Sequence, residues 1–350
     1  MTLARRLAVA MFTAVVATPS LPASAAAPNY AAINTSVVDK HALPRYHALS
    51  NATENLVSSI DHLCRQVSHA SLSTAREAFH LAFDGWQGVE HLRQGPAAEV
   101  EAHIRVKFWP DRRNLVGRHL RRTISGNDGS ILEPATFATT SIAVQGFPAL
   151  EQLLFGKEAT ERLKSPDGPI TRCKIARAIS VNLRSIAQDL HAGWRNNPDG
   201  NRPHKRVTSD LFNDLVTGLV AIADLKLGSP MGSNGRTRPR QAESHLSGRS
   251  LRNVTKNLEA LKDLYISLAS APSSPLAGTA GDQTIRNRFN AAIAESKSLG
   301  PSITAILETT DGPRRLTALK TAIKEMTRTV ALQVSEALSL VLGFNALDGD

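Results

Sequence analysis

Apolar side chains recur at intervals of three and four residues along almost the whole chain, and this spacing is the feature that most constrains its fold. The longest such stretches are residues 49–67, 73–93, 134–155, 170–195, 208–227, 251–268 and 316–341. A period near 3.6 places these residues on one face of a helix, whereas a strand needs strict alternation, which persists nowhere for long. The low aromatic content of 5% also favours helices. We therefore predict an all-α fold.

Turn-forming residues divide this pattern into two halves. Pro166, Gly168 and Pro169 interrupt the chain after the apolar run that ends at Phe155. A chain of 350 residues is also too long for one small core. We predict two tandem antiparallel helical bundles, at residues 43–165 and 166–350, each with about four main helices.

The first 25 residues are typical of an export signal. Arg5 and Arg6 precede an apolar stretch, and Ala23-Ser24-Ala25 supplies the small residues of a cleavage site. We predict cleavage near Ala25 and a periplasmic or secreted protein, and both Sec and twin-arginine export fit the arginine pair. No later stretch has the roughly 18 uncharged apolar residues of a membrane span, so we expect none.

The basic composition raises the question of nucleic acid. The formal net charge is +10 and the sequence isoelectric point is near 9.9. Export would separate the chain from nucleic acid, and basic residues alternate with acidic ones along the helices instead of forming one stripe. We expect no nucleic-acid partner.

The predicted export bears on whether the two cysteines, Cys64 and Cys173, are bonded to each other. An oxidising compartment favours a disulfide between them. Such a bridge would close a loop of about 110 residues and stabilise the fold by about 4 to 5 kcal/mol in the chain-entropy model. The alternative is a pair of buried thiols.

Charged residues continue an apolar helix face near residue 90. Trp86 lies on the apolar face of the helix expected over 73–93, and steps of four and three lead to Glu90 and Arg93. Buried charges are costly unless paired, so these two either find partners inside a cleft or mark an exposed last turn. Trp109 and Asp111 add an aromatic ring and a charge shortly afterwards.

A proline interrupts the apolar run at residues 134–155. Pro148 lacks an N–H group, so we expect it to kink the helix and to free the carbonyl of Val144. Glu151 follows within one turn, which suggests the wall of a cleft, although a purely structural kink fits equally.

A third polar group follows a basic loop with arginines at 236, 238 and 240. Glu243, Ser247 and Ser250 would share one helix face there. They either line a cleft or cap the start of a helix. No Gly-x-Ser-x-Gly motif accompanies the serines, so a nucleophilic triad is not predicted.

Four short motifs, at residues 86–93, 146–156, 242–250 and 343–350, occur in an order that resembles one known family. They include Trp86-Gln87-Gly88-Val89-Glu90, Gly146 with Glu151 and a Leu-Leu pair, Ala242-Glu243-Ser244, and the ending Leu347-Asp348-Gly349-Asp350. Together they resemble the imelysin-like family, also called insulin-cleaving or iron-regulated imelysin proteins. The resemblance covers nearly the whole mature chain and implies an exported protein of two helical bundles.

The family motif Gly-x-His-x-x-Glu is altered here, because Pro148 stands at the histidine position between Gly146 and Glu151. A metallopeptidase needs His and Glu at its metal, and a catalytic zinc takes about three protein ligands. The 11 histidines are scattered, and the single Glu-x-x-His step, Glu77 and His80, fits a solvated helix face. We predict no catalytic residue and favour a non-enzymatic protein.

These observations predict a polar cleft between the two bundles, in which inward charges find partners. Its predicted residues are Trp86, Glu90, Arg93, Trp109, Asp111, Gly146, Glu151, Glu243, Ser244, Ser247 and Asp348. The resemblance implies a binding protein in metal acquisition at the cell envelope, with a metal ion, iron, or a small molecule as ligand and an envelope protein as partner. The alternatives are a divergent metallopeptidase of this family and a helical protein-interaction module.

Overall fold

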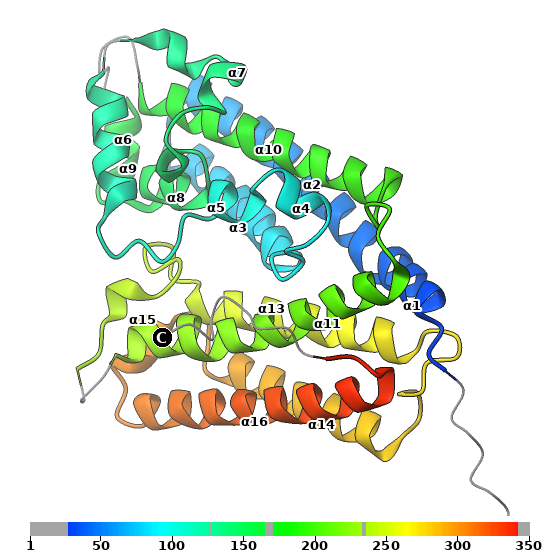
Figure 1. Cartoon of the computed structure of the whole chain (residues 1–350). Coiled ribbons are helices and arrows are strands. Elements are labelled where there is room, and N and C mark those ends of the chain that lie inside the picture. The colour runs from blue at the N-terminus through cyan, green and yellow to red at the C-terminus, as the bar shows by residue number, and fades with distance from the viewer. Residues whose placement is uncertain (1–26, 127, 165–170, 233–235, 342–350) are drawn as a thin grey trace, which may run out of the picture.

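The computed structural model describes residues 27–126, 128–164, 171–232 and 236–341, and these form helices and turns without any strand (Figure 1). The prediction of an all-α fold is confirmed. The predicted export signal and Asp348 lie outside the described residues. No helix within the described ranges is long and apolar enough to cross a membrane.

The helices pack as two layers, which we call upper and lower after their positions in Figure 1. The upper layer consists of α2 (Leu43–Arg65), α3 (His69–Gln87), α4 (Pro96–Glu99), α5 (Ala102–Val106), α6 (Leu115–Ser125), η2 (Gly129–Leu132), α7 (Pro134–Phe137), η3 (Ile142–Val144), α8 (Phe147–Phe155), α9 (Ala159–Lys164) and α10 (Arg172–Asn196). The lower layer consists of α1 (Tyr30–Val37), α11 (His204–Val220), η4 (Ala221–Leu227), α12 (Gly228–Met231), η5 (Pro239–Gln241), α13 (Ser250–Ala269), α14 (Ala280–Ser298), α15 (Ile303–Leu307) and α16 (Gly312–Leu338).

Two connections cross between the layers. The π-helical segment η1 (Val38–Ala42) continues α1 of the lower layer directly into α2 of the upper layer, and residues 197–203 lead from α10 back to α11. Because α1 packs against α11 and α13, the first described helix lies in the layer that is otherwise built from residues after 203.

The long helix α10 packs along α2 and also contacts α8. Its apolar face includes Ile179 and Leu183, and that of α2 includes Leu56 and Ile60; all four are buried, and full burial of each such side chain is worth about 1.5 to 3 kcal/mol. From the apolar pattern of residues 170–195 we predicted this helix as part of the second bundle. Its apolar face instead matches α2, so in space it belongs to the upper layer.

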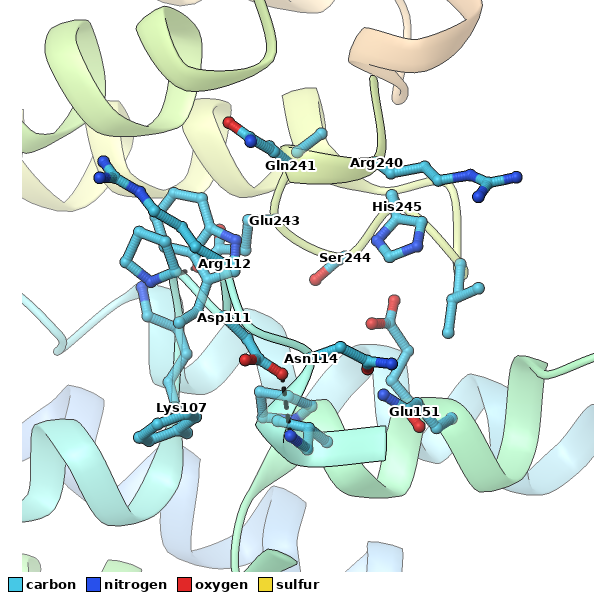
Figure 2. A pocket seen from close by; sticks show the side chains of 18 of the residues that line it. Lys107, Asp111, Arg112, Asn114, Glu151, Arg240, Gln241, Glu243, Ser244 and His245 are labelled. Atoms are coloured by element: carbon cyan, nitrogen blue, oxygen red, sulfur yellow. Dashed lines mark hydrogen bonds and ion pairs between the residues drawn. The ribbon is translucent and has the colours of Figure 1, made fainter. Parts of the chain in front are cut away.

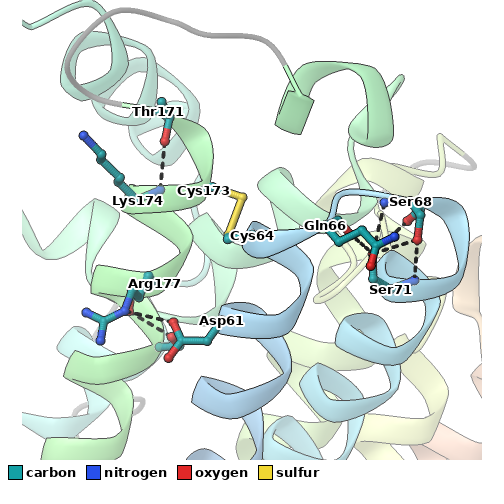
Figure 3. The surroundings of a disulfide bond; sticks show 10 residues. Asp61, Cys64, Gln66, Ser68, Ser71, Thr171, Cys173, Lys174 and Arg177 are labelled. Atoms are coloured by element: carbon teal, nitrogen blue, oxygen red, sulfur yellow. Dashed lines mark hydrogen bonds and ion pairs between the residues drawn. A yellow bond between two sulfur atoms is a disulfide. The ribbon is translucent and has the colours of Figure 1, made fainter.

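A disulfide joins the same two helices. Cys64 in the last turn of α2 is bonded to Cys173 in the first turn of α10, with their Cα atoms 5.5 Å apart (Figure 3). Below it, the Arg177 guanidinium pairs with Asp61 at 2.9 Å. The bridge fixes the start of α10 on α2 across a separation of 109 residues.

The run at residues 134–155 is not one kinked helix. The short elements α7 and η3 precede α8, which begins at Phe147 and takes Pro148 into its first turn. The first N–H groups of a helix have no partner within it, so a proline there costs no hydrogen bond. The predicted kink at Pro148 is therefore wrong: the proline starts a helix and does not bend one.

Candidate functional site

A closed ring of four charged side chains joins the two layers. From the upper layer come Glu90, in the turn after α3, and Lys107, which follows α5; from the lower layer come Lys226, in η4, and Glu243, in the turn before α13. Lys107 contacts Glu90 and lies 2.7 Å from Oε1 of Glu243. Lys226 contacts Glu90 and lies 3.0 Å from Oε2 of Glu243. Each lysine therefore pairs with both carboxylates, and we call this set the Lys–Glu ring.

Amide side chains complete the hydrogen bonding around Lys226. Its ammonium donates to Oε1 of Gln87 at 2.7 Å and to Oδ1 of Asn257 at 2.6 Å. Asn253 donates to Glu243 at 2.8 Å, and Asn257 donates in turn to the backbone carbonyl of Gln87 at 2.8 Å. Buried charges persist only where their hydrogen-bonding capacity is met, and these amides supply that condition.

The pairing favours the charged forms of Glu90, Glu243 and Lys107. Burial by itself raises the pKa of Glu90, but the ammonium groups of Lys107 and Lys226 outweigh it and hold this pKa well below its usual range. The same balance lowers the pKa of Glu243. Burial opposes the charge of Lys107 too, yet the two carboxylates raise its pKa, whereas for Lys226 burial prevails and lowers the pKa. The ring thus joins two lysines with two glutamates, whose formal charges cancel.

The backbone around the ring is held by a close approach of two segments. A Cβ atom at Gly146 would lie 2.2 Å from the carbonyl oxygen of Val106, so only glycine allows the start of α8 to pass the end of α5. This contact positions Lys107, the next residue, and sets the direction of α8 toward Glu151. Gly146 therefore has a structural role beside the ring.

Two cavities open on either side of the segment 107–110. The larger, of about 440 Å³, includes Lys107, Trp109, Glu151, Arg240 and Glu243 in its lining. Figure 2 shows Ser244 and His245 of the lower layer facing Asn114 and Glu151 of the upper layer across it. The smaller cavity, of about 300 Å³, is lined by residues that include Glu90, His91, His103 and Lys226. The Lys–Glu ring is the polar wall between them.

Glu151 makes a second contact between the layers. Its Oε1 accepts hydrogen bonds from the hydroxyl of Ser247 at 2.5 Å and from the backbone N–H of the same residue at 2.9 Å. Burial raises the pKa of Glu151 to about 7, although these two hydrogen bonds oppose the shift and Glu243 adds to it. Glu151 can therefore gain or lose a proton near neutral pH at the wall of the larger cavity.

A buried arginine adjoins this wall. Arg249, 2% exposed, pairs with Asp84 of α3 and donates to Nδ1 of His80 at 2.5 Å. Arg252 contacts the other oxygen of Asp84 at 2.5 Å. Burial, reinforced by the Arg249 charge, lowers the pKa of His80 to about 4 and keeps the imidazole neutral. His80 is therefore a partner of Arg249 and does not form part of a carboxylate–histidine metal site.

The described residues do not fit a bound metal ion. They contain no group of three or more His, Cys, Asp or Glu side chains arranged to hold one. Glu90 and Glu243 are each engaged by two ammonium groups, and Pro148, at the wall of the larger cavity, offers no ligand atom. A metal here would have to displace both lysines from the ring.

The structure brings most of the predicted site residues to this region but changes several roles. Glu90, Glu151, Glu243 and Ser244 line the cavities, Ser247 contacts Glu151, and Trp109 lies with its ring 5.5 Å from the ammonium of Lys107. Glu243 and Ser247 do not share a helix face, because α13 begins only at Ser250 and residues 243–248 form turns. The positive φ of 52° at Ser244 breaks helical continuation there.

Other predicted residues have structural roles. Trp86 is 2% exposed and belongs to the upper core, and Asp111 accepts the backbone N–H groups of Leu115 and Val116 at 2.7 and 2.9 Å, which caps α6. Arg93 lies beyond the end of α3 at Gln87, so it does not continue the face of that helix; it is exposed overall but contributes to the lining of the smaller cavity. Its backbone N–H donates to Asp214 at 3.1 Å.

Sequence reasoning missed both lysines of the ring, their amide partners and Arg249. One signal was present in the sequence. Lys226 interrupts the apolar run at residues 208–227, and a lysine at such a position needs a carboxylate partner if the helix is buried. Lys107 gave no such signal, because it lies between helices.

The chain is similar in sequence to one protein family and to one of its described relatives. The family model described as Imelysin matches residues 42–330. Iron-regulated protein A of Synechococcus elongatus is 25% identical over 243 residues, which are 65% of this chain and 62% of that protein. The chain therefore matches less than two thirds of the length of this relative.

Two solved structures share the fold. An imelysin-like protein from Psychrobacter arcticum 273-4 superposes with a TM-score of 0.76 at 18% identity, covering 92% of this chain and 100% of the other. A candidate iron-regulated protein A precursor from Parabacteroides distasonis gives a TM-score of 0.68 at 17% identity, covering 89% and 97%. At these identities the likeness concerns the architecture.

Proposed function

Because this chain belongs to the imelysin family, we propose that it is an exported, non-enzymatic binding protein of the cell envelope that takes up a metal as an anionic chelate in the larger cavity. The names of its relatives supply the iron context, since two of them are described as iron-regulated protein A or its precursor. The word precursor, applied to the relative from Parabacteroides distasonis, agrees with the export signal that we predict here.

The observation that carries this proposal is the neutralisation of the site's carboxylates. Glu90 and Glu243 are paired with ammonium groups and Asp111 caps α6, so they are poor ligands for a bare cation. The other charged groups in the lining of the larger cavity include Arg112 and Arg240, one from each layer. Guanidinium groups favour carboxylate and phosphate oxygens, so this cavity suits an anion.

The size and lining of the cavity fit a small organic ligand. Its volume of about 440 Å³ lies within the range of about 300 to 1,000 Å³ that is usual for such sites. Phe83, Phe108 and Trp109 supply apolar contact, and Glu151 supplies one proton-exchanging group. A polycarboxylate that surrounds a ferric ion combines the charge and the size that these residues would recognise.

Calorimetric titration with ferric citrate, citrate alone and ferrous ion tests the proposal. We expect ferric citrate to bind, and the double variant Arg112→Gln/Arg240→Gln to weaken its binding at least tenfold, which is about 1.4 kcal/mol. The matched control, Arg195→Gln/Arg328→Gln, removes two exposed arginines far along the chain and should leave the affinity unchanged. Stoichiometric binding of ferrous ion that survives the Arg112/Arg240 change would overturn the proposal.

The peptidase alternative has its own test. Purified wild-type protein should not cleave an unfolded polypeptide, and Pro148→His should not create cleavage, because the ligands that a catalytic zinc requires do not converge at the wall. Cleavage that a chelator abolishes would show that the protein is an enzyme.

A further inference from the structure

The helix α6 and the residues just before it carry a cluster of exposed arginines, most of which the proposed binding function does not use. Residues 112–126 contain five arginines and one histidine and no acidic residue. This segment is an exception to the alternation of basic and acidic residues that the sequence analysis described for the chain. The four arginines that lie outside the larger cavity are Arg113, Arg118, Arg121 and Arg122, and we call them the α6 arginine face.

These side chains are exposed and uncompensated. Each of the four is exposed, and within the described ranges none has an ion pair or a side-chain hydrogen bond. Arg118 and Arg122 are four residues apart on the helix, so their like charges repel and destabilise it slightly. Some exposed arginines elsewhere pair with carboxylates, as Arg177 does with Asp61 and Arg206 with Asp210, whereas at α6 several arginines stand together without an acidic residue in the same helix. The α6 arginine face is therefore arranged for an anion outside the chain.

The geometry of α6 favours a flat anionic surface over a groove-bound segment. The apolar face of the helix, with Val116, Leu120 and Ile124, is buried and packs toward α8. The arginines are thus on the side of α6 opposite its buried face; α6 is the helix at the left of the upper layer in Figure 1. Side chains at spacings of three and four lie on one helix face, so Arg118, Arg121 and Arg122 can touch one plane together.

We propose that the α6 arginine face docks the protein on an anionic phospholipid membrane. Guanidinium forks bind phosphate oxygens in pairs, and each basic residue near an anionic bilayer contributes to attraction within a Debye length. No apolar side chain of α6 is free to insert, because the apolar face is buried in the protein. The association is therefore electrostatic, reversible and sensitive to salt.

Docking through α6 also orients the cavity. Arg112, the residue immediately before this face, lines the larger cavity together with Arg240. A membrane that contacts α6 would therefore lie beside the opening between the layers. This orientation is a consequence of the membrane proposal and does not depend on which ligand the cavity accepts.

Vesicle co-sedimentation of the exported, processed protein tests the proposal. We expect binding to vesicles with about 30 mol% phosphatidylglycerol in phosphatidylcholine, no binding to pure phosphatidylcholine, and loss of binding near 1 M salt, where the Debye length falls to about 3 Å. Arg118→Glu/Arg121→Glu/Arg122→Glu should reduce the bound fraction at least tenfold. Lys40→Glu/Arg195→Glu/Arg328→Glu, which makes the same charge change at exposed positions elsewhere, should not.

Further arms separate folding and competing anions from the membrane effect. The triple glutamine variant at the same three arginines introduces no new charge, and with an unchanged circular dichroism spectrum it must also lose vesicle binding. Release of the wild type by millimolar inorganic phosphate would assign the face to free phosphate and overturn the membrane proposal. Equal weakening by the control triple variant, or capture by polyglutamate without binding to vesicles, would overturn it as well.

Discussion

Replacing Lys226 by methionine tests whether the Lys–Glu ring holds the two layers together. The lysine is 3% exposed, and its ammonium contacts Glu90, Glu243, Gln87 and Asn257. Methionine keeps an unbranched side chain of similar length but removes all four contacts. The ring is then left with two carboxylates and one ammonium, and so with one uncompensated negative charge.

The expected loss of unfolding free energy follows from these contacts. Removing one partner of a buried ion pair costs about 3 to 5 kcal/mol, because the other charge stays buried. Lys107 still reaches both carboxylates and limits this cost, whereas the oxygens of Gln87 and Asn257 lose a donor at about 1 to 3 kcal/mol each. Such losses do not add fully, so we expect Lys226→Met to cost about 4 kcal/mol in total.

A second change separates charge from packing. Lys226→Met/Glu90→Gln leaves one ammonium and one carboxylate, so the ring is neutral again. We expect the double variant to be at least about 1 kcal/mol more stable than the sum of the two single losses predicts, because the residues share one network. A purely steric effect at position 226 would show no such coupling.

Urea unfolding with the disulfide intact measures both effects. Circular dichroism and tryptophan fluorescence should be followed together, since coincident transitions justify a two-state free energy. Lys297→Met is the matched control: this lysine is 59% exposed and pairs with Glu259 at 2.8 Å, so its loss should cost at most about 1 kcal/mol. If Lys226→Met costs no more than the control, the reasoning about the ring is wrong.

Three further outcomes are expected from the same structure. Replacing Cys64 and Cys173 by alanine should lower the unfolding free energy by up to about 5 kcal/mol, because a bridge across 109 residues removes much conformational entropy from the unfolded chain. A melting temperature equal to that of the wild type within error would contradict this. Burial raises the pKa of Glu151 from 4.5 to about 7, so the folded protein binds this proton more tightly than the unfolded chain does, and the contribution of Glu151 to stability should fall, by up to about 3 kcal/mol, as pH rises from 4.5 to 7. Glu151→Gln should remove this contribution, seen as a pH-dependent difference between the unfolding free energies of the wild type and the variant. Asp111→Ala should cost about 1 to 2 kcal/mol through loss of the α6 cap, and Asp111→Asn should retain part of it; equal losses for both would argue against capping.

The architecture was accessible from the sequence because burial of an apolar face imposes a period on the residues. Leu49, Leu56 and Ile60 of α2 keep that period and are all buried. The partner of each helix was not accessible, since periodicity shows that a face is buried without showing against what. The packing of α10 on α2 depends on this missing information, and the same is true of the path of α1 into the lower layer.

Local breaks in the helices were harder to predict than the helices. At Pro148 the apolar pattern alone could not distinguish a kink from a helix start, because a residue without an N–H group can occur at either place. The spacing of Glu243 and Ser247 in the sequence is helical. In the structure, the positive φ angles of Ser244 and Gly248 prevent a helix there. A backbone conformation of this kind leaves little trace in one sequence.

Of the Lys–Glu ring, only the two glutamates were predicted from the sequence. The acidic members Glu90 and Glu243 were predicted from their neighbouring motifs, and in the structure both have the charged partners that burial requires. The partners lie 17 residues from the carboxylates in sequence: Lys107 follows Glu90, and Lys226 precedes Glu243, by that distance. Each lysine also pairs with the carboxylate of the other layer. Charge pairing restricts the sign of the missing residue but not its position.

Pro148 changes the chemistry of the wall of the larger cavity without changing the fold there. It occupies the first turn of α8, where an N–H group has no intrahelical acceptor, so the helix start tolerates it. Glu151 lies three residues further, on the same side of the helix, and its contact with Ser247 is intact. A histidine at 148 would add an imidazole to the wall of the larger cavity, whereas proline leaves an apolar ring there. Under the proposed function, recognition would therefore rest on Glu151 and on the cationic groups of Lys107, Arg112 and Arg240.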